Sequence, residues 1–206
     1  MDLVCVVADR SIEAVIEAVL RRYEALGIRP IEFETLVHPE RDPGCFHEPA
    51  KLLGGYTDRA NHALVVLDRA WEGAPARDAS ELERLLEAAL ARISLAEWAK
   101  AVVIEPELEA WVFSDSPHVA TTLGWKGSTD ALRSALEAEG LWERDRAKPE
   151  DPKRAMDWVL RRAGLPRSSS LFRTLASQVS LQRCEDRSFL RLVKLLCGWF
   201  GVNQAT

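Results

Sequence analysis

Residues 3–27 read LVCVVADRSIEAVIEAVLRRYEALG, and this stretch decides the fold. Its first five residues are all apolar and mostly β-branched, which predicts a short strand buried on both faces. Apolar side chains then recur at helical spacing from Ile12 to Leu20, and we expect Gly27 to end this helix. A buried strand that leads directly into an amphipathic helix is typical of a parallel sheet covered by helices.

The same pattern returns further along the chain. Residues 31–37 alternate between apolar and polar, which suits an edge strand, while residues 63–67 and 101–104 are apolar runs typical of buried strands. Asp78 and Glu81 have the spacing of a capping box and predict a helix between the two buried strands. Strands separated by helices in this way pair in parallel through right-handed crossovers. We therefore predict an α/β fold with a short, Rossmann-like parallel sheet and flanking helices.

The remaining residues, 116–206, are predicted to be mainly helical. Ser116-Pro117 and Asp151-Pro152 each combine an N-cap residue with a proline suited to the first helical position. No linker or low-complexity tract separates this part from the first. We therefore expect one domain over residues 1–206, with residues 116–206 packed on the sheet as a helical extension.

Composition limits the functions that the chain can have. Its 206 residues include 27 basic and 32 acidic side chains, and a net charge of −5 argues against a protein that coats nucleic acid by charge alone. None of the four cysteines forms a CxxC pair, so zinc-ribbon and thioredoxin-like sites have no support, and Cys5 and Cys197 are expected to be buried. Without an export signal or an apolar run of roughly 20 residues, the protein is expected to be cytoplasmic, without a membrane partner.

Acidic residues follow each of the three predicted buried strands: Asp9, then Asp68, then Glu105, Glu107 and Glu109. Ligands of open parallel sheets bind beyond the carboxyl ends of the strands, so these side chains are expected to meet at one edge. Converging carboxylates need a compensating cation, and oxygen ligands suit Mg²⁺ or Mn²⁺. The structural alternative is that Asp9 caps a helix and the other acids are solvated loop residues.

Basic residues are more frequent in the C-terminal half, where nucleic acid or phosphate would be bound. Ser168 precedes an apolar run, so it either presents a helix N-terminus to phosphate or only caps that helix. Residues 38–44 follow the edge strand and include His38 and Asp42, which either join the acidic edge or only form a turn. Three tryptophans are expected either to stack on bases or to pack in the core: Trp142, Trp158 and Trp199. The candidates for binding phosphate are Arg41, Lys148, Arg167 and Ser168.

Three segments, DRSIE (9–13), LVVLD (64–68) and ELEAW (107–111), together resemble a family of TOPRIM-like bacterial proteins of unassigned activity. Many members of that family are encoded in antiphage-defence loci. The run LASQVSL (175–181), followed by Cys184 and Phe189, is similar to the family's ending, so the resemblance spans most of the chain. The nearest likeness is to the small subunit of uncertain role in methylation-associated defence systems.

The resemblance implies a TOPRIM-like sheet and roles for its acids. In TOPRIM enzymes a glutamate after the first strand acts in acid–base chemistry, and an Asp-x-Asp pair after a later strand holds Mg²⁺. The catalytic candidates are then Asp9, Glu13 and Glu109. The candidates for binding Mg²⁺ or Mn²⁺ are Asp68, Glu72 and Glu107.

The chain departs from the family's motifs at several positions. Asp9 stands where the family has glutamate, and Ala70 takes the place of the second aspartate. The motif carboxylates that match outright are Glu13, Asp68 and Glu109. The loss of one carboxylate should weaken metal binding unless Glu72 replaces it.

Three functions are compatible with these observations. The first is a subunit of a bacterial antiphage-defence system, with a degenerate TOPRIM-like acidic site, that binds another defence protein or nucleic acid. The second is a Mg²⁺-dependent TOPRIM-type nuclease or another metal-dependent phosphodiester hydrolase. The third is an unrelated small-molecule enzyme, which the lack of a Gly-rich phosphate loop, nucleophile elbow or HExxH motif disfavours. Ala70 favours the first function.

Overall fold

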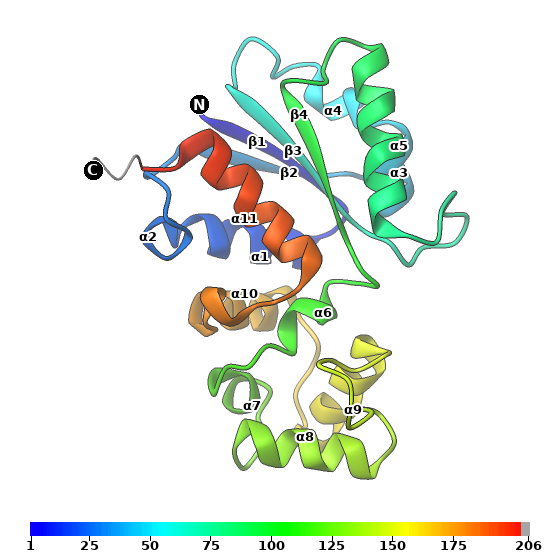
Figure 1. The fold of residues 1–206 in the computed structure, drawn as a ribbon, viewed down its shortest axis with the longest axis vertical. Coiled ribbons are helices and arrows are strands. Elements are labelled where there is room, and N and C mark those ends of the chain that lie inside the picture. The colour runs from blue at the N-terminus through cyan, green and yellow to red at the C-terminus, as the bar shows by residue number, and fades with distance from the viewer. Residues whose placement is uncertain (203–206) are drawn as a thin grey trace.

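The apolar runs form one four-stranded parallel sheet in the computed structural model, which describes residues 1–202 (Figure 1). Every residue of the first strand is buried, whereas every residue of the second is half-buried, as an edge position requires. The predicted α/β class is therefore confirmed. In the order β2-β1-β3-β4, the strands are β2 Phe33–Val37, β1 Leu3–Val7, β3 His62–Asp68 and β4 Ala99–Ile104.

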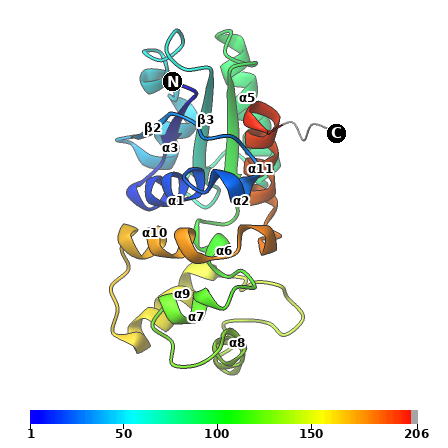
Figure 2. The ribbon, with the colours of Figure 1, turned by 90° about the vertical axis from the view of Figure 1, so that its left-hand side faces the viewer.

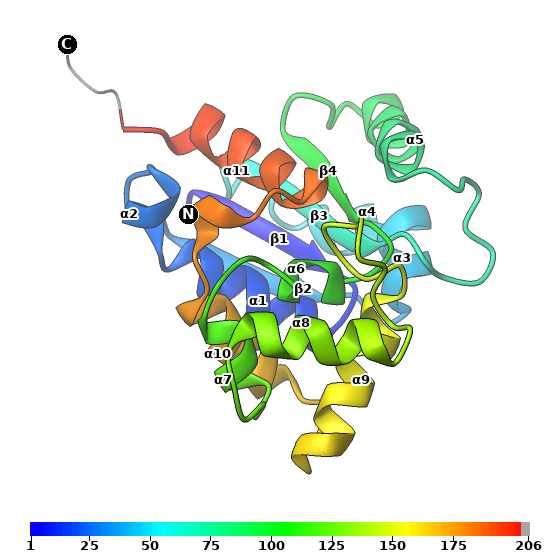
Figure 3. The same cartoon turned by 60° about the horizontal axis from the view of Figure 1, so that its bottom comes forward.

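Helices cover both faces of this sheet (Figures 1 and 3). One face carries α1 (Arg10–Leu20) and α11 (Arg187–Phe200). The other face carries α3 (Arg41–His47), α4 (Ala50–Leu53) and α5 (Ala79–Arg92). Their placement follows from right-handed crossovers, because the chain moves in opposite directions across the sheet before and after β2.

The strand order places the ligand crevice of such a sheet between β1 and β3. The chain passes from β1 to β2 on one side, and from β2 to β3 on the other side of β1. Open α/β sheets bind ligands outside the carboxyl ends of the strands at this point of reversal. Asp9 and Asp68 follow or end these two strands, so the topology brings two of the predicted acids to the expected crevice.

Two local predictions about the first half of the chain were wrong. The helix expected to run to Gly27 is interrupted after Leu20, and a short α2 (Tyr23–Leu26) precedes Gly27, whose φ of 71° is left-handed. The segment expected to be a turn at 38–44 instead enters α3. Gly44 lies inside that helix, and this position requires glycine because a Cβ atom there would overlap the buried ring of His38.

The helical part of the chain divides in two (Figure 2). After α6 (Glu109–Val112), a lobe lies beyond the carboxyl ends of the strands, and α10 (Ser169–Gln178) then returns to pack on α1. Only after the 3₁₀ turn η1 (Leu181–Arg183) does the chain rejoin the sheet through α11. The lobe consists of α7 (His118–Thr122), α8 (Thr129–Ala138) and α9 (Pro152–Ala163).

Most of the N-cap residues predicted from the sequence cap helices in the structure. Asp78 accepts hydrogen bonds from the backbone of Ser80 and Glu81, and Asp151 accepts one from the backbone of Arg154. At Ser116-Pro117 the helix begins one residue later than predicted, so that Pro117 is the N-cap residue. Within residues 1–202, no helix combines the length and the apolar character that crossing a membrane requires.

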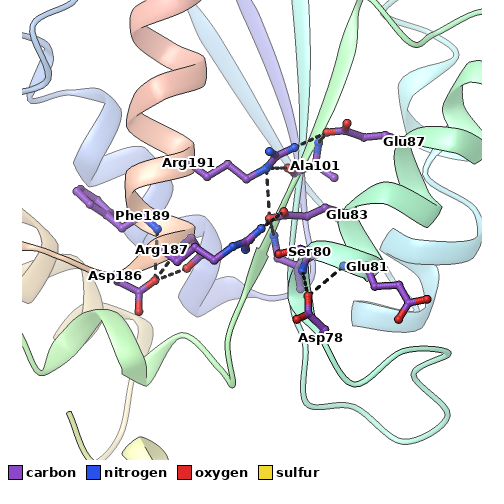
Figure 4. Close-up of polar contacts among 12 residues, drawn as sticks. Asp78, Ser80, Glu81, Glu83, Glu87, Ala101, Asp186, Arg187, Phe189 and Arg191 are labelled. Carbon is purple, nitrogen blue, oxygen red and sulfur yellow. Dashed lines mark hydrogen bonds and ion pairs between the residues drawn. The ribbon is translucent and has the colours of Figure 1, made fainter. Parts of the chain in front are cut away.

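Side chains close the outer edge of β4 in place of a fifth strand (Figure 4). Glu83 and Glu87 of α5 accept hydrogen bonds from the backbone N–H groups of Val103 (3.0 Å) and Ala101 (3.1 Å). Arg191 of α11 donates to the Ala101 carbonyl at 2.8 Å and also binds both glutamates. An open edge is a template for unwanted strand pairing, and these contacts block this one.

Candidate functional site

Asp68 lies at the centre of the acids at the carboxyl edge. Its Oδ1 atom is buried and accepts no hydrogen bond from residues 1–202. Burial raises the pKa of this carboxyl group well above its usual value, and the charges of the surrounding acids raise it further. Those acids, in order of their effect, are Asp42, Glu109, Asp9 and Glu107. The structure therefore brings acids that follow each of the three buried strands together around one carboxyl group, whereas Glu105 pairs with Arg69 at 3.5 Å.

Asp9 and Asp42 approach Asp68 from two different helices. Asp9 is the N-cap of α1, and its Oδ1 atom accepts hydrogen bonds from the backbone N–H groups of Ser11 (2.7 Å) and Ile12 (2.9 Å). Asp42, in the first turn of α3, accepts a hydrogen bond from the backbone N–H of Asp68 at 2.8 Å. Burial raises the pKa of Asp42. Asp9 thus has the capping role foreseen as its structural alternative and also lies at the acidic edge.

Glu109 is completely buried, and a basic residue of the chain neutralises it. Its carboxylate forms an ion pair with Arg167, which lies between α9 and α10 and also approaches Asp157 at 3.9 Å. Burial raises the pKa of Glu109, whereas the charge of Arg167 opposes this rise. Arg167 therefore stabilises a carboxylate that would otherwise be isolated in the protein interior.

Glu107 has a partner from the same lobe. Lys153, in the first turn of α9, donates a hydrogen bond to Glu107 Oε2 at 2.5 Å, and this contact raises the pKa of Lys153. Lys153 and Arg167 thus extend from the helical lobe to the two glutamates that follow β4. Each of these two glutamates therefore has a basic side-chain partner within the protein.

These contacts decide whether the acids fit a divalent metal ion. In the described residues, no three side chains among Asp, Glu, His and Cys converge closely enough to hold one. Glu107 and Glu109 are paired with Lys153 and Arg167, and one oxygen of Asp9 is occupied by backbone N–H groups. The residues present therefore do not fit a metal centre of the TOPRIM type in this arrangement.

Known proteins give no further guide to this site. No family model matches the sequence, and neither a curated protein nor a solved structure is significantly similar to it. The geometry of the acidic edge has to be interpreted from its own residues.

The structure does not bring two of the acidic candidates to the acidic edge. Glu13 forms an ion pair with Arg10 at 2.8 Å within the first turn of α1. Glu72 is exposed in the loop after β3 and forms no ion pair within residues 1–202, so it does not replace the carboxylate missing at Ala70. Glu72 lies in an exposed turn four residues after Asp68, whereas Asp42 supplies a carboxylate from α3.

The candidates for binding phosphate are mostly engaged within the protein. Lys148 donates to the Ala110 carbonyl (2.6 Å) and to Asp186 (2.9 Å), and the Ser168 hydroxyl caps α10 by accepting from the backbone of Leu171. Arg167 is held by Glu109, as described above. Arg41 is exposed beside the open cleft between the ends of β1 and β2, and its guanidinium forms no ion pair within residues 1–202.

Burial corrects the expectation for Cys197 and decides between the alternatives for two of the tryptophans. Cys197 is exposed, and its thiol contacts the carbonyl of Leu26, whereas Cys5 is buried as predicted. Trp142 is buried in the lobe, and Trp199 stacks on His62 with ring centroids 4.6 Å apart. These two tryptophans are therefore packing residues.

Sequence reasoning missed the contribution of Lys153 to the acidic edge, and it foresaw that of Asp42 only as one of two alternatives. The position of Asp42 was foreseeable in part, because the segment after β2 ends at the same edge as the other loops. Lys153 is 46 residues from Glu107, and nothing in the local pattern indicates that α9 would approach α6.

Proposed function

We propose that this chain is a non-catalytic subunit of a bacterial antiphage-defence complex, with a degenerate TOPRIM-like acidic edge, and that it works by binding a partner protein or nucleic acid. The observation that carries the proposal is the pairing of Glu109 and Glu107 with Arg167 and Lys153. Side-chain cations fill the electrostatic role that Mg²⁺ has in TOPRIM enzymes. Ala70 and the exposed Glu72 support the same conclusion.

One observation favours a second candidate, a metal-dependent phosphodiester hydrolase. The buried Oδ1 atom of Asp68 has no partner, and Asp42 lies beside it. A divalent cation would stabilise both carboxylates in the ionised form. This function requires the Asp68 carboxylate, whereas the binding function does not, so Asp68 separates the two candidates.

The test is phage resistance in cells that carry the defence locus with Asp68→Asn in this chain. Because the substitution keeps size and shape but removes the charge, we expect the efficiency of plating to equal that of the wild-type locus. Deleting the chain should abolish protection, and an immunoblot checks that the variant is present at normal levels. Loss of protection by a folded Asp68→Asn variant would contradict the proposal and favour the hydrolase.

A further inference from the structure

The helical lobe carries a second candidate site, whose side chains are not those of the acidic edge. A hollow of about 380 Å³ is lined by Trp125, Lys126 and Arg162, together with Gly124 and Ala163. It lies between the α7–α8 turn and the C-terminal end of α9. Residues 116–206 contain 15 basic and 10 acidic residues, whereas residues 1–115 contain 12 and 22, so the lobe belongs to the basic part of an acidic chain.

The turn that presents Trp125 and Lys126 is fixed by its glycines. Gly124 and Gly127, on either side, have φ angles of 72° and 152°, which side chains strongly disfavour. A Cβ atom at Gly124 would also come within 2.8 Å of Leu165. The backbone N–H of Trp125 donates to the Ala120 carbonyl at 2.9 Å. The tryptophan and the lysine are therefore held against the end of α9.

Flat π systems gather around this hollow. The rings of Trp125 and Trp158 lie 5.9 Å apart between centroids with a tilt of 32°, and the guanidinium of Arg162 lies 4.4 Å from the centroid of Trp158. Both tryptophans are only half-buried. Aromatic rings and guanidinium planes are the groups on which proteins stack unpaired nucleic-acid bases.

Unpaired cations surround the same aromatic residues. Arg154, Trp158 and Arg161 share one face of α9, because they are separated by four and three residues. Arg154, Arg161 and Lys126 are exposed, and none forms an ion pair with a carboxylate of residues 1–202. In contrast, Lys153 and Arg167 face the acidic edge and are paired. Arg162 is exposed as well but forms an ion pair with Glu139 at 3.4 Å, so the cations that can bind phosphate without breaking an ion pair are Lys126, Arg154 and Arg161.

We propose that this stacking site, formed by Trp125, Lys126, Trp158, Arg161 and Arg162, binds single-stranded nucleic acid. Bases stack on Trp125 and Arg162, and the phosphates follow Lys126 and Arg161 along the end of α9. A duplex would bind more weakly, because its bases are already stacked on each other. The inference rests on the proposed function, of which it names the ligand class and the residues.

The experiment measures the fluorescence anisotropy of labelled oligo(dT) with the full chain, and compares it with oligo(dT) annealed to oligo(dA). We expect the single strand to bind more tightly, and Trp125→Ala to weaken its binding roughly tenfold. Trp125→Phe keeps an aromatic surface and should restore most of the affinity. Lys126→Ala and Arg161→Ala should each reduce the slope of log K against log salt by about 0.7, because each removes one phosphate contact.

Matched variants separate this site from the acidic edge. Trp71→Ala, next to the acidic edge, is the control for Trp125→Ala. Lys194→Ala, at an exposed position of α11, is the control for Lys126→Ala. Neither change should affect binding. If Trp71→Ala weakens binding and Trp125→Ala does not, the strand binds at the acidic edge, which overturns this inference but not the proposed function. The inference is also overturned if wild-type protein fails to bind oligo(dT), whereas the plating test decides the proposed function independently.

Discussion

Replacing Arg167 with alanine should lower the free energy of unfolding by roughly 3 kcal/mol at neutral pH, because it leaves the buried carboxylate of Glu109 without a counter-charge. The measurement is urea-induced unfolding followed by tryptophan fluorescence. Arg146→Ala is the matched control, since Arg146 forms an exposed ion pair with Glu143 at 2.6 Å. Such surface pairs contribute at most about 1 kcal/mol.

The loss of unfolding free energy in Arg167→Ala should increase as the pH rises. Burial already raises the pKa of folded Glu109 above its unfolded value, and removing Arg167 raises it further. In Arg167→Ala, between the unfolded and the folded pKa of Glu109, the folded state binds more protons than the unfolded state. The free energy of unfolding of the variant therefore falls as pH rises through that range. The destabilisation should therefore be small near pH 4, at about the pKa of an unperturbed glutamate, and grow towards neutral pH.

A second substitution isolates the charge of Glu109 as the cause. Adding Glu109→Gln to Arg167→Ala should remove this pH dependence and recover part of the lost stability. A loss in Arg167→Ala that is the same at all pH values, and that Glu109→Gln does not relieve, would show that Arg167 acts through packing alone.

Replacing Glu83 with alanine should destabilise the chain by roughly 2–4 kcal/mol, because Glu83 is the buried acceptor that closes the edge of β4. The change leaves the N–H group of Val103 without a partner and removes the ion pair of α5 with Arg187 and one of its two ion pairs with Arg191 of α11 (Figure 4). Thermal unfolding monitored by circular dichroism measures the effect.

The control for Glu83 lies on the same helix. Glu81 is exposed and only approaches Arg84 at 3.7 Å, so Glu81→Ala should cost at most about 1 kcal/mol. Glu83→Gln keeps an acceptor for the N–H group of Val103 but loses the charge. Its destabilisation should therefore lie between those of Glu83→Ala and Glu81→Ala. Equal effects of Glu83→Ala and Glu81→Ala would mean that the side chains at the edge of β4 do not stabilise the sheet.

The strands were predictable because their signal is local. Residues 3–7, 63–67 and 101–104 are continuous apolar runs, and such runs fit only buried strands once glycines and capping residues delimit the helices between them. The interruption of the first helix was not predictable in this way. The apolar residues around Arg22 still suit a helix, but Arg22 turns to bind the carbonyls of Ala176 and Val179, which are distant in sequence.

The acidic site was predictable only in its topology. Parallel strands bring their carboxyl ends to one edge, which is why Asp9, Asp68 and Glu109 could be grouped from the sequence. Their electrostatic partners could not be found, because Arg167 was interpreted as a phosphate ligand and its pairing depends on how the chain returns from the helical lobe to α10. Asp42 illustrates the same limit, since its aspartate–proline–glycine context is typical of a turn but here lies within α3.

The proposed function requires that Lys153 and Arg167, and not a divalent metal, balance the acids around Asp68. This is tested by the Tm of the wild-type chain in MgCl₂ or MnCl₂, with NaCl of equal ionic strength as reference and Asp68→Asn measured in parallel. We expect that neither metal raises Tm and that wild type and Asp68→Asn respond alike. A rise in Tm with metal concentration in the wild type that disappears in Asp68→Asn would contradict it, because only a ligand of the folded state produces such a shift.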